Sequence, residues 1–180
     1  SNMGASDILE VFSIYGQQDS GSSELARILI EFDVNQITAD RASGAIPASG
    51  SVNFFLNMYD APHSQTVPRD FTLTVSAISA SWEEGYGIDM DFYEDITRDG
   101  FGSNWIQARQ SSSADGGQWG SAGGDYHTDS SSSFTQQFSD GFENLSVDVT
   151  PLVEQWLDSA GNILGSKPNY GFGIQLSNSF

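Results

Sequence analysis

Aspartates clustered in glycine-rich surroundings are the residues of this sequence most suited to metal chemistry. Asp89, Asp91 and Asp95 lie close together, and Asp125 and Asp129 follow a glycine-rich stretch. Calcium takes about six to eight oxygen ligands, many of them loop carboxylates and backbone carbonyls. The clusters therefore predict a structural calcium site. The alternative is a solvated acidic surface, since the ligand spacing of an EF-hand is absent.

Aromatic residues in expected loops are the second group that could do chemistry. Trp105, Trp119 and Tyr126 fall in or near such loops, where an exposed flat ring could stack on a sugar. Glycines flank Trp119, so we expect it to be the most exposed of the three and the best glycan-binding candidate. The alternative is that these rings pack under a lid or in the core, as we expect for Trp82.

Catalytic patterns are missing from the sequence. The only histidines, His63 and His127, lie in expected loops without a neighbouring nucleophile signature. No P-loop, nucleophile elbow, zinc-protease helix or dinucleotide fingerprint is present. Paired carboxylates occur, but pairs are expected by chance among 24 acidic residues. The sequence therefore favours a protein that is not an enzyme.

The charge balance limits the possible partners. The chain contains six Lys and Arg and 24 Asp and Glu, which gives a net charge of −18. A field of that sign repels phosphate backbones, so we expect no nucleic-acid partner. The chain has no cysteine, and no apolar run approaches the roughly 20 residues of a membrane span. We therefore expect neither a disulfide framework nor a membrane partner.

A strand over residues 26–34 is the clearest expected element. Its even-numbered residues are all apolar, and Leu29 is the only apolar residue among the odd-numbered ones. Period-2 alternation of this kind indicates a strand with one face in the core. Arg27, Glu31 and Asp33 should then point outward. Similar patterns predict strands at 7–15, 51–59, 71–78, 88–93, 104–108, 134–138, 145–149 and 169–176.

One helix is expected, over residues 151–158. Thr150 can cap it, Pro151 suits its first position, and the following apolar residues fall on one face. Residues 35–50 are small and polar, and we expect a connection there. Residues 1–180 then form a single all-β domain, a jelly-roll-like β-sandwich with one short C-terminal helix.

Four segments of the chain carry a family resemblance: RILIEFDV (27–34), SWEE (81–84), DVTPLVEQW (148–156) and NYGF (169–172). In the same order, they resemble segments of the DNRLRE-type β-sandwich, a family that overlaps carbohydrate-binding module family 96. The first is similar to its strand with arginine and a Phe-Asp pair, and the second to its Ser-Trp segment. The third resembles its Asp-Val-Thr segment and the fourth its Asn-Tyr-Gly strand.

Residues 2–11 and 55–59 are in addition similar to structural proteins of tailed marine bacteriophages. This resemblance implies a non-enzymatic virion protein, such as a capsid decoration, neck, tail or fibre component. It would contact other virion proteins, further copies of itself or host polysaccharide. The alternative is a carbohydrate-binding module of a secreted polysaccharide-degrading enzyme or a cell-surface adhesin. Because family members continue past the last segment, we expect a fragment that lacks its final strand or strands.

Overall fold

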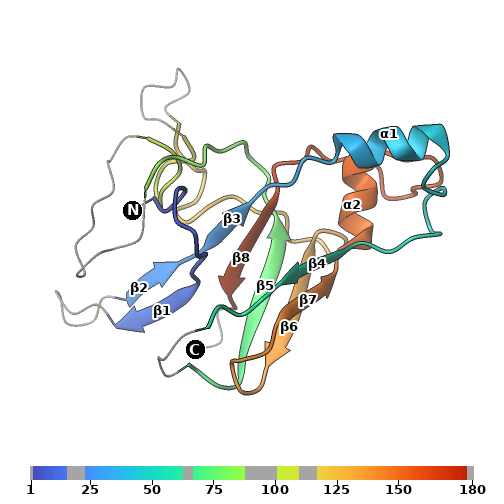
Figure 1. Cartoon of the computed structure of the whole chain (residues 1–180). Coiled ribbons are helices and arrows are strands. Elements are labelled where there is room, and N and C mark those ends of the chain that lie inside the picture. The colour runs from blue at the N-terminus through green and yellow to red at the C-terminus, as the bar shows by residue number, and fades with distance from the viewer. Residues whose placement is uncertain (1, 16–22, 63–66, 88–100, 110–116, 178–180) are drawn as a thin grey trace.

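Antiparallel β-strands dominate the computed structural model, which describes residues 2–15, 23–62, 67–87, 101–109 and 117–177 (Figure 1). A four-stranded sheet has the order β3-β8-β5-β6, and two pairs, β4-β7 and β1-β2, accompany it. The predicted all-β class is confirmed. The strands are β1 (Phe12–Tyr15), β2 (Ser23–Ala26), β3 (Ile28–Ile30), β4 (Phe55–Met58), β5 (Phe71–Ala77), β6 (Ser133–Phe138), β7 (Leu145–Asp148) and β8 (Phe172–Leu176).

The main core lies between the four-stranded sheet and the β4-β7 pair. Val75 and Ile174 of the sheet are almost completely buried there, opposite Leu56 and Val147. Gln136 of β6 closes one side of this core. Its side chain accepts a hydrogen bond from the Ser146 amide and donates one to the Asn144 carbonyl. The β4-β7 pair is thereby held beside β6.

A second, smaller core covers the opposite face of the same sheet. Ile78, Ala108 and Trp119 are buried in it, and Leu29 packs against them. Ile28 enters the main core, so β3 buries apolar side chains on both of its faces. This accounts for the one apolar exception in the alternating pattern of residues 26–34.

The predicted C-terminal helix is confirmed as α2 (Thr150–Leu157), with Leu152 completely buried and Pro151 in the first turn. The expected capping role of Thr150 is wrong, because Val149 occupies the N-cap position and makes no side-chain cap bond. The Thr150 hydroxyl instead accepts a hydrogen bond of 2.8 Å from the Phe54 amide. This contact ties the helix start to the strand segment that leads into β4.

A second helix, α1 (Asn35–Ser43), lies where we expected a connection. None of its residues is fully buried, and Ile37 packs only partly against the main core, so the sequence shows no continuous apolar face. A bidentate ion pair holds it to α2, with Arg41 donating to the two carboxylate oxygens of Glu154 at 3.0 and 2.9 Å. In the described part of the chain, neither helix is long and apolar enough to cross a membrane.

Five of the expected strands differ from the structure. Those over 51–59 and 169–176 begin only at Phe55 and Phe172. The strand expected over 7–15 begins only at Phe12, and the one over 26–34 ends at Ile30 with a break at Arg27. Residues 104–108 form no strand, and Gln107 makes only an isolated bridge to Gln118. The strand expected over 88–93 lies outside the described residues.

Candidate functional site

An arginine held between two aromatic rings is the centre of the region that contains the predicted aromatic residues. Arg27 is the single residue between β2 and β3 and is oriented toward the second core. Its guanidinium carbon lies 4.7 Å from the centre of the Trp105 ring and 5.7 Å from that of Tyr126. It also donates a hydrogen bond of 2.6 Å to the Gly123 carbonyl. The contacts combine two cation–π interactions with a charge-assisted hydrogen bond.

Tyr126 fixes this cluster to the sheet. Its ring lies directly over Gly173 of β8, where an added Cβ would come within 2.1 Å of the ring, so only glycine fits. Its hydroxyl donates to the Gly123 carbonyl at 2.8 Å. Burial raises the pKa of Tyr126 above 10.0, although the nearby Arg27 opposes the increase. The phenol therefore stays protonated and serves as a hydrogen-bond donor.

Trp119 is buried, so the expectation that it is the most exposed of the three aromatics is wrong. Its side chain is 7% exposed in the second core, and its indole nitrogen donates to the Asn104 carbonyl at 2.9 Å. The flanking chain folds back over it, with the Trp119 amide bonded to the Ile106 carbonyl. Trp82 packs against the same core, as expected, and donates to the Tyr170 carbonyl. The structure thus brings Trp105, Trp119 and Tyr126 together, and their rings are engaged in packing contacts.

Asn2 joins the N-terminal segment to two loops and was not singled out by the sequence. Its amide nitrogen donates to the carbonyls of Glu84 and Ser103, both at 2.6 Å. Its amide oxygen accepts from the amides of Gly4 and Gly87 at 3.0 and 3.1 Å. The side chain is buried and makes four hydrogen bonds, the number expected for a fully satisfied asparagine amide. No sequence pattern marks such a residue, because all four partners are backbone groups.

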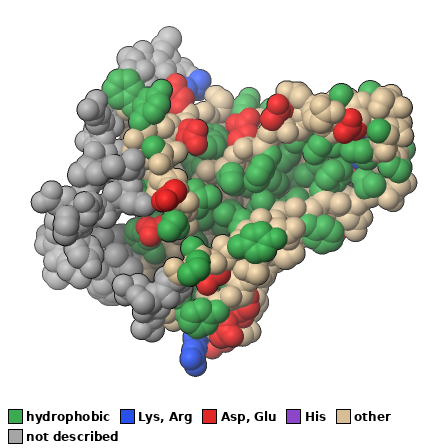
Figure 2. Space-filling view, in the orientation of Figure 1, with side chains coloured by type: hydrophobic (Ala, Val, Ile, Leu, Met, Phe, Trp, Pro, Cys, Tyr) green, Lys and Arg blue, Asp and Glu red, His purple; other side chains and the backbone are tan. Residues whose placement is uncertain are grey.

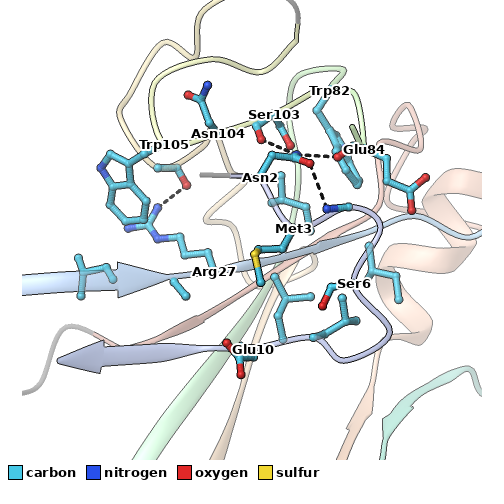
Figure 3. A pocket seen from close by; sticks show the side chains of 18 of the residues that line it. Asn2, Met3, Ser6, Glu10, Arg27, Trp82, Glu84, Ser103, Asn104 and Trp105 are labelled. Carbon is cyan, nitrogen blue, oxygen red and sulfur yellow. Dashed lines mark hydrogen bonds between the residues drawn. The ribbon is translucent and has the colours of Figure 1, made fainter. Parts of the chain in front are cut away.

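A cavity of about 710 Å³ lies between the N-terminal segment, β2, β3 and these loops (Figure 3). Its volume is in the range of about 300–1,000 Å³ that is common for small-molecule sites. Trp105 and Trp119 contribute to its wall, together with apolar residues such as Leu9 and Leu25. Arg27, Glu10 and Glu84 are its charged residues. Because many of its lining side chains are apolar, the cavity suits an apolar group.

The predicted metal ligands do not form a common site in the described part of the chain. Asp125 accepts hydrogen bonds from the amides of Gly120 and Ser121, at 2.7 and 2.8 Å. Asp129 accepts from Ser131 and pairs with Lys167. Among the described residues, no three acidic, histidine or cysteine side chains are grouped so that they could hold a metal ion. The remaining candidates, Asp89, Asp91 and Asp95, lie outside the described residues.

The hydrogen bond from Ser131, together with Lys167, lowers the pKa of Asp129 to about 2. Asp129 therefore stays ionised at neutral pH. It supports the turn that leads into β6, and Lys167 also donates to Gln155 of α2. The structure assigns Asp125 and Asp129 to turns.

The fold and the aromatic cluster together define an antiparallel, β-sandwich-like protein with two cores on one shared sheet. Comparisons with family models, with curated proteins and with solved structures find no match.

Proposed function

We propose that this chain is a non-enzymatic structural protein of a tailed-bacteriophage virion and acts through protein–protein contacts. A capsid decoration, neck, tail or fibre position is compatible with the proposal. The observation that carries it is a band of hydrophobic side chains in the hollow between β4 and the β3–α1 arm (Figure 2). Contiguous exposed apolar surface is typical of a protein-binding face. Phe32, 45% exposed, is one apolar side chain after β3 that remains partly open.

The polar residues of the four family-like segments support a structural role. One residue in each segment uses its side chain to hold backbone: Arg27 binds the Gly123 carbonyl, and Trp82 binds that of Tyr170. Asp148 accepts from the Thr150 amide, and Asn169 donates to the Phe32 carbonyl. Residues committed to architecture in this way are not free to act on a substrate.

The proposal predicts that the protein is a component of the particle. Virions of a phage that encodes this chain would be purified by density gradient, washed with high salt and analysed by mass spectrometry. We expect peptides of this chain to be recovered in constant ratio to the major capsid protein. Recovery only from the culture supernatant, with none in the washed particles, would overturn the proposal.

Polysaccharide binding is a second candidate, favoured by a row of exposed residues on the outer face of β4. Phe55 and Tyr59 are 53% and 83% exposed, with Asn57 between them. Ser146 and Asp148 of β7 lie opposite Asn57 and Phe55. Two exposed rings with polar groups beside them offer both stacking faces and hydrogen bonds to sugar hydroxyls.

If this face binds glycans, a polysaccharide array should give a signal that Tyr59→Ala reduces by about tenfold, a loss of about 1.4 kcal/mol. Tyr86→Ala is the matched control, because Tyr86 is equally exposed at 81% but lies in another loop. Equal signals for both variants, or none for the unaltered protein, would remove the support for this candidate.

A further inference from the structure

One edge of β4 has unpaired backbone groups. The Val149 amide donates to the Phe54 carbonyl, which makes 54 and 149 a hydrogen-bonded pair of the antiparallel ladder. Such pairs alternate along a ladder, so Leu56 and Met58 also bond to β7, whereas Phe55 and Asn57 point their backbone groups away. The Ser146 amide, opposite Asn57, accordingly bonds outward to Gln136. Within the described residues, β7 is the only strand that pairs with β4.

The layer that contains β4 covers only part of the four-stranded sheet. β7 lies beside β6, at one end of the sheet, and β3 forms the opposite end. Core-facing residues follow this arrangement: Val75 of β5 is fully buried, whereas Ile30 of β3 is only half-buried and Phe32 is exposed. The open band therefore runs between the free edge of β4 and the β3 side, and Figure 2 shows hydrophobic side chains gathered in it.

We propose that the free edge of β4 binds an extended segment of a partner protein that alternates apolar with basic residues. The inference rests on the proposed function as a protein-contact module and specifies its mode. The outward carbonyls and amides of Phe55 and Asn57 would form a ladder with the segment, as in strand addition. Its apolar side chains would cover Ile30 and Phe32, and every second residue would face solvent.

The negative charge of the chain favours a basic partner segment. The chain has a net charge of −18, and of its few cations Arg41 and Lys167 are paired with carboxylates while Arg27 lies between aromatic rings. A second copy would bring an equal negative charge to the edge. A segment with lysine or arginine at its solvent-facing positions is attracted instead. The occupant we infer is therefore a basic strand of a different protein.

The test uses a synthetic peptide that alternates lysine with valine and isoleucine, and a peptide of the same composition without the alternation. Binding would be measured by fluorescence polarisation and by hydrogen exchange of individual amides. We expect the alternating peptide to slow exchange at Phe55 and Asn57, whose amides face the open edge. The Leu56 and Met58 amides already bond to β7 and should change little. Affinity for the alternating peptide should fall with added salt.

Asn57→Pro removes the outward amide without disturbing the ladder to β7, since proline is tolerated at a free strand edge. We expect it to weaken binding by about tenfold, as the loss of backbone hydrogen bonds would. Asn57→Ala is the matched control and should bind within about twofold of the unaltered protein, because it keeps the backbone amide.

Three results would overturn the inference: equal binding of both peptides, no protection at Phe55 and Asn57, or equal losses in the two Asn57 variants. Protection that appears at high protein concentration without peptide would show that a second copy is the occupant, and would overturn the basic partner. These outcomes are independent of the virion analysis. A chain found in virions that fails to bind the peptide disproves only the strand site, and the reverse result disproves only the virion role.

Discussion

Arg41→Ala should lower the free energy of unfolding by about 3–5 kcal/mol, because it leaves the buried Glu154 carboxylate without its partner. The side chains of Arg41 and Glu154 are only 8% and 5% exposed, and the pair is bidentate. Ile37 of α1 packs partly against the main core, and this ion pair joins the helix to α2. Urea unfolding followed by circular dichroism gives the loss of stability. A change below about 1 kcal/mol, the range of a surface pair, would contradict the expectation.

The double variant Arg41→Met with Glu154→Leu is the control, because an apolar pair of similar volume often replaces a buried ion pair at little cost. Burial disfavours the charged form of Glu154, but the hydrogen bonds from Arg41 and Ser159 outweigh it and lower its pKa below 4.5. A carboxyl group whose pKa is lower in the folded than in the unfolded state stabilises the fold at pH values above its unfolded pKa. This stability is lost as the pH falls through its folded pKa. From pH 7 to pH 3 the unaltered protein should therefore lose more stability than the double variant.

Asn2→Asp should open the contact between the N-terminal segment and the loops at 84–87 and 103. It removes both hydrogen-bond donors and places a carboxylate against the carbonyls of Glu84 and Ser103. Each buried partner left unsatisfied costs about 1–3 kcal/mol, so local opening should increase at least about 30-fold. Hydrogen exchange of the Gly87 amide and proteolysis within residues 2–11 measure the opening.

Asn53→Asp is the matched control, because it makes the same change of charge at an exposed position. It should leave both measurements unchanged. If the two variants behave alike, the effect is one of net charge, and the four bonds of Asn2 do not hold the segment. The cavity should also lose its N-terminal wall in Asn2→Asp, so exchange should increase at Ala5, whose amide bonds to the Gly87 carbonyl, as well as at Gly87.

Elements whose pattern reflects burial on a single face could be predicted from the sequence. The strand at 71–78 is β5 within one residue, and the expectations at 134–138 and 145–149 match β6 and β7. In these strands alternate residues face the main core, so period-2 hydrophobicity translates directly into structure. The short α2 was equally readable, since its apolar residues fall on one helical face.

Features held by polar or long-range contacts could not be read in this way. The helix α1 depends on an ion pair between residues 41 and 154, which no local pattern records. Trp119 looked exposed because its neighbours are glycines, yet those glycines let the chain fold back and bury it. Arg27 looked like an ordinary outward residue until its partners at 105, 123 and 126 were placed beside it. The aromatic residue types were identified, but their role follows only from tertiary structure.

The sheet that the two cores share should also limit the folding rate of this protein. Ile28 pairs with Ile174, and the strand that joins the two cores therefore closes between segments far apart in the sequence. Contacts of such long sequence separation carry a large loop-closure entropy and make folding slow. Until that pairing forms, both faces of β3 are uncovered at the same time. The ordering of β3 against β8 should accordingly be the late step that couples the two cores into one cooperative unit.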